Sequence, residues 1–209
     1  MEDAVKIALS GGCIVYPTST QPALGCIPSP EALDVLFHIK NRSENMPVSI
    51  GVANLEQAKT LVELTDDIPD FLDSFPEGSI TLVLPAKKTL DKRLGGDKIA
   101  IRVVTHPIAK ALLRATGPLT ATSANISGMT PEQTCEAAAS TLIEAGHKVG
   151  VISGNTGSGL PSTLIAWYSV CGTSERASIE VLREGIIPTK EVQSWWKNRT
   201  SNSGEMPGM

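Results

Sequence analysis

Short apolar runs rich in β-branched residues recur along this chain, and segments with helical spacing separate them. Runs of this length and composition are typical of buried strands. They predict strands over residues 13–16, 48–52, 79–85, 99–104, 119–122, 149–152, 163–167 and 179–182. Because strands and helices interleave without a strict strand–helix–strand repeat, we expect a single α/β domain around a twisted, mixed sheet.

Capping residues mark where several helices begin. Ser29 offers a capping hydroxyl, and Pro30 and Glu31 supply a proline and an acid for the first turn that follows. This combination predicts a helix start at Ser29. The Thr-Pro-Glu-Gln segment at 130–133 has the pattern of a capping box and predicts a helix start at Thr130. Helices are expected over residues 3–10, 30–40 and 107–115, from a cap at Asn54 to Leu61, and from Thr130 to a stop at Gly146.

The length of 209 residues suits one globular domain with a sizeable core. We expect this domain to cover residues 1–190 and a polar, flexible tail to cover 191–209, with packing of Trp195 and Trp196 on the body left open. No apolar run approaches the ~20 residues of a membrane helix, and the N-terminus lacks the pattern of a secretory signal. The expectation is a cytoplasmic protein without a membrane segment.

The charge pattern bears on nucleic-acid binding. The formal net charge is −4, and no basic stripe is visible in the sequence. Because neutralising phosphates drives tight binding to nucleic acids, we expect no strong RNA or DNA binding, while weak RNA binding in a local basic cleft stays open. The four cysteines are far apart and lack C-x-x-C spacing, so we expect buried thiols in a reducing compartment: Cys13, Cys26, Cys135 and Cys171.

Several common catalytic signatures are absent from the sequence. It contains neither a Walker-type phosphate loop nor the H-E-x-x-H zinc motif nor the G-x-S-x-G elbow of serine hydrolases. His38, His106 and His147 lie on separate segments without ligand spacing, which disfavours zinc. We therefore assign no acid–base residue and no metal ligand.

Hydroxyls and cations gather instead where strands and helices end. They lie in segments 16–20, 40–42, 121–128, 157–163 and 183–185, with Arg102 inside a strand. Cations at a helix end also complement its dipole, and a Ser/Asn-rich turn needs no ligand, so each segment alone leaves both interpretations open. Taken together, without a nucleophile–base pair, they favour a nucleotide or phosphate site that works by positioning and charge neutralisation.

These segments, in this order, resemble the YrdC/Sua5 family of threonylcarbamoyl-AMP synthases in its short, single-domain form. The resemblance runs from about residue 11 to residue 188, and its most specific pieces are Lys-x-Arg at 40–42 and Thr-Ser-Ala-Asn-x-Ser-Gly at 122–128. It is also carried by Tyr16-Pro17-Thr18 with Thr20, Leu24-Gly25-Cys26, Pro47, Gly78-Ser79-Ile80-Thr81, Ile101-Arg102-Val103, His106-Pro107, Pro161-Ser162-Thr163 and Leu182-Arg183-Glu184-Gly185. The resemblance implies a YrdC-like α/β fold, with a twisted mixed sheet and helices around a large, positively lined, concave cavity.

The same resemblance implies a function. It implies a nucleotidyltransferase that forms L-threonylcarbamoyladenylate and pyrophosphate from ATP, bicarbonate and L-threonine, with Mg²⁺ accompanying the ATP. A separate tRNA threonylcarbamoyl-transferase complex would then use the product for N6-threonylcarbamoyladenosine modification. The implied ATP-binding residues are Lys40, Arg42, Ser123, Asn125 and Arg183, and the implied threonine-binding residues are Thr18, Thr20, Arg102 and Ser162.

The first loop departs from the family pattern. Ser19 stands where the family has an acid, and Gln21-Pro22-Ala23 stands where x-Tyr-Gly is usual. Pro22 offers no aromatic face, no hydroxyl and no N–H. Two alternatives therefore stay open. One is a YrdC-like paralogue, non-catalytic or of altered specificity, that binds nucleotide or RNA; the other is a carbamoyl-adenylate-forming domain, which the short chain disfavours.

Overall fold

The structure is a computed structural model that describes residues 1–157, 159–168 and 178–202. Its helices are α1 (Glu2–Leu9), α2 (Pro30–Lys40), α3 (Leu55–Ala58), α4 (Asp67–Asp73), α5 (Pro107–Thr116), α6 (Cys135–Glu144) and α7 (Thr189–Asn202), with the 3-10 helix η1 (Lys92–Leu94). Its strands are β1 (Cys13–Tyr16), β2 (Ala23–Gly25), β3 (Ile50–Val52), β4 (Ile80–Pro85), β5 (Lys98–Val103), β6 (Leu119–Thr120), β7 (Thr122–Ser123), β8 (Val149–Val151), β9 (Thr163–Tyr168) and β10 (Ser178–Arg183). The expected α/β class is confirmed.

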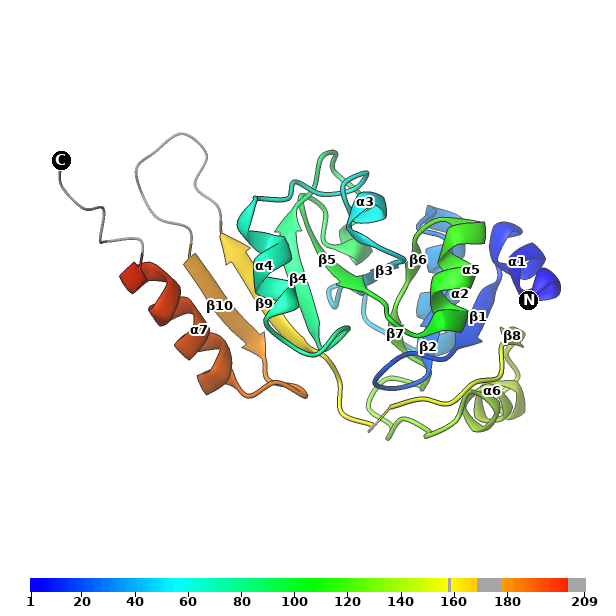
Figure 1. The fold of residues 1–209 in the computed structure, drawn as a ribbon. Helices are drawn as coiled ribbons and strands as arrows, with labels where there is room; N and C mark the ends of the chain where they lie inside the picture. The colour runs from blue at the N-terminus through cyan, green and yellow to red at the C-terminus, as the bar shows by residue number, and fades with distance from the viewer. Residues whose placement is uncertain (158, 169–177, 203–209) are drawn as a thin grey trace, which may run out of the picture.

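The strands form two mixed sheets rather than the one that the sequence predicts. A four-stranded sheet has the order β7-β2-β1-β8, and a six-stranded sheet has the order β10-β9-β4-β5-β3-β6. Parallel pairs occur in both, β1 with β8 in the first and β3 with β5 and β4 with β9 in the second. Figure 1 shows the six-stranded sheet in the middle of the molecule and the four-stranded sheet toward the end that carries α1.

The reason for two sheets lies in the segment 119–122, which the sequence predicts as one strand. Leu119 and Thr120 pair with β3 in the six-stranded sheet, whereas Thr122 and Ser123 pair with β2 in the four-stranded sheet. Ala121 lies between them, where its N–H donates to the carbonyl of Ser49 at 2.8 Å and its carbonyl accepts from the Ser49 hydroxyl at 2.8 Å. The chain thus crosses from one sheet to the other within a single residue.

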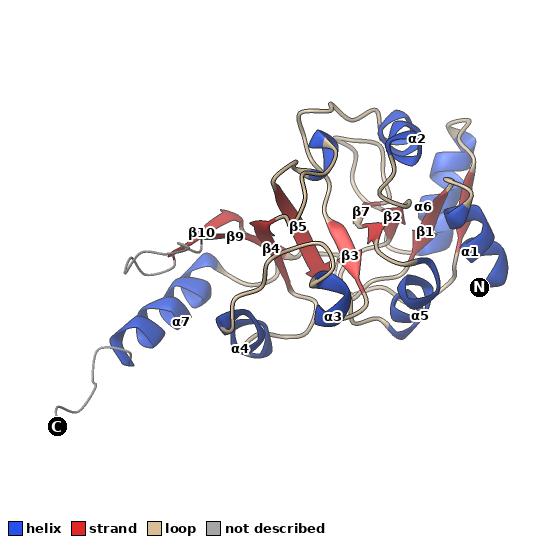
Figure 2. Ribbon diagram, turned by 90° about the horizontal axis from the view of Figure 1, so that it is seen from above, coloured by secondary structure: helices blue, strands red, loops and turns tan. Residues whose placement is uncertain are grey.

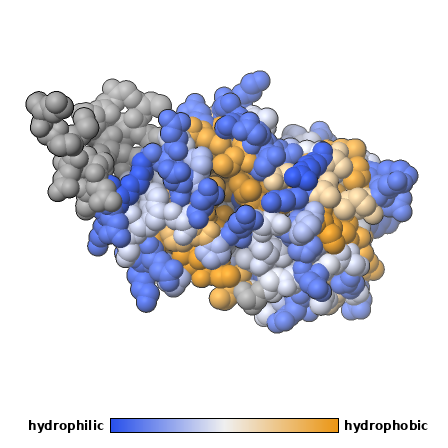
Figure 3. Space-filling view, in the orientation of Figure 1, coloured by the Kyte–Doolittle hydropathy of each residue, from blue (hydrophilic) through white to orange (hydrophobic). Residues whose placement is uncertain are grey.

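Helices cover the sheets on several sides. Figure 2 shows α3, α4 and α7 along one side of the six-stranded sheet and α2 on the other side. At the far end α1 and α6 lie against β1 and β8. A larger apolar cluster lies under α2, α4 and α7, and a smaller one lies between α1, α5 and β1. Figure 3 shows apolar residues gathered in the middle of the face seen there and toward the end that carries α1 and α5.

The helix signals in the sequence were right for α2 and wrong for α6. Ser29 caps α2 by accepting the N–H of Ala32 at 3.3 Å, and the helix ends at Asn41, whose φ of 46° is left-handed. The helix α6 does not begin at Thr130: it begins at Cys135, where the Thr134 hydroxyl accepts the N–H of Ala137 at 3.1 Å. The capping oxygen of Thr134 therefore sets the start, and the capping-box pattern before it belongs to the preceding turn. The short elements β2, α4 and η1 were not predicted.

The C-terminal helix packs on the body of the protein. Trp195 lies against Phe71 with ring centroids 4.8 Å apart, and its indole N–H donates to the Ser74 hydroxyl at 2.7 Å. Trp196 contacts the buried Trp167, with ring centroids 5.4 Å apart. Residues 189–202, which the sequence analysis assigns mostly to a polar tail, therefore form a helix that an aromatic cluster anchors. Residues 203–209 of that tail lie outside the described residues.

Two further observations concern cysteines and membranes. Cys13, Cys26 and Cys135 are buried free thiols, as expected, and Cys171 lies outside the described residues. Within the described ranges, no helix is both long and apolar enough to cross a membrane.

Candidate active site

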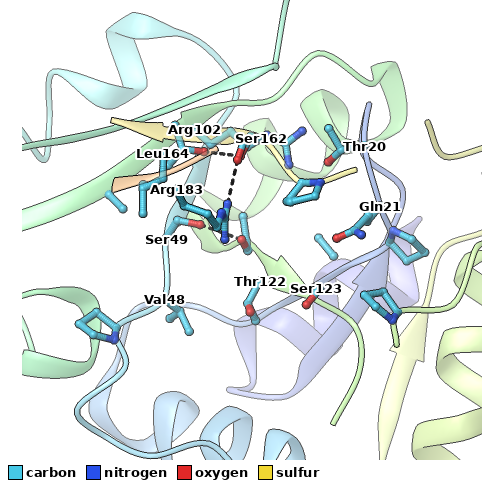
Figure 4. A pocket seen from close by; sticks show the side chains of 18 of the residues that line it. Thr20, Gln21, Val48, Ser49, Arg102, Thr122, Ser123, Ser162, Leu164 and Arg183 are labelled. Carbon is cyan, nitrogen blue, oxygen red and sulfur yellow. Dashed lines mark hydrogen bonds between the residues drawn. The ribbon is translucent and has the colours of Figure 1, made fainter. Parts of the chain in front are cut away.

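A pocket of about 340 Å³ lies where the two sheets meet (Figure 4). The six-stranded sheet lines it through β4, β5, β9 and β10, and the four-stranded sheet lines it through β2 and β7. Four connecting segments complete the walls: the loops after β1 and α2, the segment between β7 and α6, and the segment before β9. The polar lining side chains are Thr20, Gln21, Arg42, Ser49, Arg102, Thr81, Thr122, Ser123, Ser162 and Arg183.

Three arginines give this pocket its charge, and among the described residues that line it none is Asp or Glu. Arg42 donates to the carbonyls of Met46 at 2.6 Å and Pro47 at 3.1 Å. Arg102 and Arg183 likewise donate to neutral acceptors, Arg102 to Gly78 O at 3.0 Å and Arg183 to Ser162 O at 2.8 Å. Across the parts of the chain that the structure describes, none of the three forms an ion pair with a carboxylate. Their positive charge is therefore available to an anion.

The pKa shifts of these arginines reflect the same lack of counter-charge. The pKa of Arg102 is lowered to about 10, chiefly by burial, with an opposing effect of Tyr16 and a smaller lowering by the nearby charge of Arg183. Burial also lowers the pKa of Arg42, again with a contribution from Arg183, and burial lowers that of Arg183 itself. Because Arg183 acts on both of the others, the three guanidinium groups share one electrostatic region. An anion bound in the pocket would relieve their mutual repulsion.

Six of the nine site residues predicted from the sequence line this pocket: Thr20, Arg42, Arg102, Ser123, Ser162 and Arg183. They come from six separate stretches of the chain and meet because β5, β7, β10 and the connecting loops end at the same place. The other three, Thr18, Lys40 and Asn125, are buried and do not line it. Each of these three instead makes hydrogen bonds that shape a pocket wall.

Thr18 orders the first loop. Its hydroxyl donates to the carbonyl of Gln21 at 2.6 Å and accepts the N–H of Thr20 at 3.2 Å. This is a side-chain turn of the kind that Ser and Thr form with nearby backbone. The loop is also tied to the segment before β9, because Gln21 Nε2 donates to the carbonyl of Gly159 and Gly159 N–H donates to Thr20 O at 3.1 Å.

Lys40 and Asn125 shape the wall that Ser123 belongs to. The Lys40 ammonium donates to the carbonyls of Ser123 at 2.5 Å and Asn125 at 2.7 Å, and the lysine is 1% exposed. Asn125 accepts from the Ser123 hydroxyl at 2.5 Å and donates to the carbonyl of Met129 at 2.5 Å. Burial and, to a smaller extent, the charge of Arg42 lower the pKa of Lys40 to about 7.

Sequence reasoning missed four polar lining residues, Gln21, Ser49, Thr81 and Thr122. Thr81 could have been found, since it is a polar residue inside the apolar run of β4, and its hydroxyl lies 2.7 Å from that of Ser162. Ser49 carries a similar but weaker signal, since it lies inside the run 48–52 that the sequence predicts as a strand, and the structure places it just before β3. Its role at the sheet crossing depends on Ala121, which is distant in sequence.

A resident metal ion has no set of protein ligands among the described residues. No group of three or more His, Cys, Asp or Glu side chains that could hold one is found there. His38 and His147 do come together, with ring centroids 5.6 Å apart, but on a surface away from the pocket lining. The pocket chemistry thus rests on cations and hydroxyls.

Comparisons with known proteins agree with this geometry. The Sua5/YciO/YrdC family model, which carries the description "telomere recombination", matches residues 6–185. A threonylcarbamoyl-AMP synthase of Escherichia coli O1:K1 is 36% identical over 161 residues, covering 74% of this chain and 83% of that protein. The synthase is a nucleotidyltransferase-type enzyme.

Solved structures show the same fold. The crystal structure of P. abyssi Sua5 complexed with L-threonine superposes with a TM-score of 0.78 at 27% identity, covering 92% of this chain. The present chain spans only 56% of that Sua5 chain. The crystal structure of E. coli YciO superposes with a TM-score of 0.73 at 28% identity, covering 90% of both chains. From its sequence match, its fold and its arginine-lined pocket, the chain belongs to the Sua5/YciO/YrdC family.

Proposed function

We propose that this protein is a threonylcarbamoyl-AMP synthase, which forms L-threonylcarbamoyladenylate and pyrophosphate from ATP, bicarbonate and L-threonine. The observation that carries the proposal is a pocket with three arginines, several hydroxyls and no carboxylate. Each substrate brings negative charge: a triphosphate, a bicarbonate ion and the carboxylate of an amino acid. Guanidinium groups without carboxylate partners suit all three.

The phosphates of ATP fit the part of the pocket formed by Arg42, Arg183 and Ser123. Arg42 and Arg183 lie close enough for one charge to lower the pKa of the other, so both can act on the same triphosphate. Lys40 and Asn125, the other two members of the expected ATP-binding set, support this wall through the hydrogen bonds around Ser123. Mg²⁺ enters as part of the MgATP substrate, because the pocket lining offers it no carboxylate ligand.

Threonine fits the part of the pocket around Arg102, Thr20 and Ser162. Arg102 is 7% exposed, and its guanidinium donates to two neutral acceptors, the carbonyl of Gly78 and the hydroxyl of Ser19. Its charge can therefore pair with the carboxylate of the amino acid. The likeness to P. abyssi Sua5, whose crystal structure contains L-threonine, supports this assignment. Thr18 contributes indirectly by ordering the loop that carries Thr20.

The reaction then needs little covalent chemistry from the protein. The threonine nitrogen attacks the carbon of bicarbonate and water leaves, which gives an N-carboxylate. One oxygen of that carboxylate attacks the α-phosphorus of ATP, and the bond from the α-phosphorus to the pyrophosphate oxygen breaks. The arginines hold the two anions together and offset the charge that moves onto pyrophosphate. The product serves N6-threonylcarbamoyladenosine formation in tRNA through a separate transferase complex.

The test is pyrophosphate release from MgATP by the purified protein. Release should require threonine and bicarbonate together, and mass spectrometry should detect L-threonylcarbamoyladenylate. Release that is independent of threonine, or supported equally by serine and other amino acids, would reject threonine as the substrate. ATP binding without turnover under any of these conditions would favour a non-catalytic member of the family.

A further inference from the structure

We propose that Lys40 is a positioning residue: its ammonium holds the turn from Ser123 to Ser127 in the conformation that presents Ser123 to the pocket, without contacting the bound nucleotide. The inference rests on the proposed function, because it concerns how the ATP-binding wall is built. It separates the roles of two cations, Lys40 and Arg42, that lie two residues apart.

The end of α2 sends these two side chains to different places. The helix ends at Asn41 in the left-handed conformation, where Asn41 N–H donates to His38 O at 3.1 Å and Arg42 N–H donates to Phe37 O at 3.1 Å. This sharp reversal leaves Lys40 on the buried face of the helix, whereas Arg42 lines the pocket. One residue in the αL conformation is enough to change the direction of the chain in this way.

Lys40 is bound to both ends of the turn. Its ammonium donates to Ser123 O at 2.5 Å and to Asn125 O at 2.7 Å, and its own carbonyl accepts the N–H of Ser127 at 2.8 Å. Three hydrogen bonds therefore connect one residue of α2 to three residues of the turn. An ammonium has three donors, and two of them are used on carbonyls that no other side chain satisfies.

Burial argues against direct contact with a ligand. Lys40 is 1% exposed, and it is absent from the lining of the pocket, to which Ser123 belongs. A movement of the ammonium toward a phosphate would weaken its two charge-assisted hydrogen bonds to the carbonyls of Ser123 and Asn125. Residues 122–128 contain no ionisable side chain. The ammonium of Lys40 therefore supplies the charge in the hydrogen bonds that hold this turn.

The experiment compares Lys40→Met, which keeps an unbranched apolar stem and removes the ammonium, with Lys59→Met as the matched control. Lys59 is exposed and pairs only with Glu56 on its own helix. Without any nucleotide, hydrogen exchange at the amides of residues 123–127 should become about tenfold faster in Lys40→Met and stay unchanged in Lys59→Met. A lysine that only contacts ATP would leave these amides unaffected, and that result would overturn the proposal.

The second measurement is calorimetric binding of a non-hydrolysable ATP analogue. Lys40→Met should weaken binding by about ten- to a hundred-fold, while the KM for threonine changes by less than about threefold. When Ser123 is already replaced by Ala, adding Lys40→Met should lower the affinity for the ATP analogue by less than about threefold, because Lys40 acts through Ser123. Full additivity of the two substitutions would contradict a positioning role.

A third measurement uses the wild-type protein and decides the matter if Lys40→Met does not fold. In a crystal structure with the ATP analogue, Nζ of Lys40 should remain bonded to the carbonyls of Ser123 and Asn125. A phosphate oxygen within hydrogen-bond distance of Nζ would overturn the proposal. If the wild-type protein binds no nucleotide at all, the proposed function fails, and the exchange measurement still decides whether Lys40 orders the turn.

Discussion

The hydroxyl of Tyr16 donates a hydrogen bond of 3.0 Å to the carbonyl of Thr120, and this bond joins the two sheets. Tyr16 ends β1 in the four-stranded sheet, and Thr120 ends β6 in the six-stranded one. The tyrosine is fully buried, and its ring is closely flanked by Gly25, where an added Cβ would lie 2.6 Å from the ring. The bond lies one residue before the crossing at Ala121, so it connects the two sheets close to the point where the chain passes between them.

Removing this hydroxyl should destabilise the protein. Tyr16→Phe leaves a buried carbonyl without its partner, which costs about 1–3 kcal/mol. Thermal unfolding should show a loss of about 2–4 °C in Tm for each kcal/mol in a protein of this size. Tyr168→Phe is the matched control, because Tyr168 is exposed and its hydroxyl bonds Glu180 at the surface, so the Tm of this variant should hardly change. Equal effects of the two substitutions would contradict a special role for the inter-sheet bond.

Arg42 should dominate the affinity for ATP. Arg42→Ala removes a guanidinium that can bind a phosphate with two hydrogen bonds, and charge-assisted bonds of this kind contribute about 1.5–3 kcal/mol. The Kd for ATP should rise by about ten- to a hundred-fold in calorimetry. Arg114→Ala, at an exposed position on α5, should leave ATP binding unchanged. Normal ATP affinity in folded Arg42→Ala would remove Arg42 from the site.

ATP binding should weaken as pH rises above neutrality. Lys40 has a pKa of about 7 in the free protein because it is buried beside Arg42. A polyanion in the neighbouring pocket favours the charged ammonium, so the complex holds more protons than the free protein above pH 7. Affinity should then fall by up to about tenfold per pH unit between pH 7 and the higher pKa of the complex. In Lys40→Met the affinity for ATP should no longer fall over pH 7–9. An identical slope of affinity against pH in the wild-type protein and in Lys40→Met would assign the pH dependence to another group.

Because α7 is anchored away from the pocket, a substitution in its aromatic cluster should lower the stability of the protein without changing its kinetics. Trp195→Ala removes a half-buried indole from the aromatic cluster with Phe71, and should lower the free energy of unfolding by about 2–3 kcal/mol. The KM values for ATP and threonine, measured well below the melting temperature, should not change, because α7 does not line the pocket. Deletion of residues 203–209 should leave both stability and kinetics unchanged. A changed KM in Trp195→Ala would show that the cluster also shapes the site.

The altered first loop should affect threonine rather than ATP. Pro22 and Ala23 line the pocket and put no aromatic side chain there. The double change Pro22→Tyr/Ala23→Gly should lower the KM for threonine, since one buried aromatic contact contributes about 1–3 kcal/mol, or about ten- to a hundred-fold in affinity. Steady-state pyrophosphate release at saturating ATP measures this effect. An increase in the KM for threonine would mean that another side chain already fills this part of the pocket.

The sequence by itself determined the α/β class, most strands and the start and end of α2. These features depend on local chemistry: β-branched runs, the hydroxyl of Ser29 and the left-handed conformation that Asn41 tolerates. The motif order also indicated the family, and six of the nine site residues expected from it line one pocket. Local signals misled at the start of α6, which lies at Cys135 rather than Thr130, and over residues 191–202, which form most of α7 rather than a polar tail.

Only the tertiary structure decided how the strands divide and which polar residues face the pocket. The change of sheet at Ala121 is invisible in the run 119–122, because it is set by pairing with β3 and β2 and by the bond to Ser49, all distant in sequence. Lys40 and Arg42 look alike in the Lys-x-Arg motif, yet one is buried under the Ser123 turn and the other lines the pocket. Sequence fixes which groups are present, whereas burial and partners, which arise only from packing, decide what each group contacts.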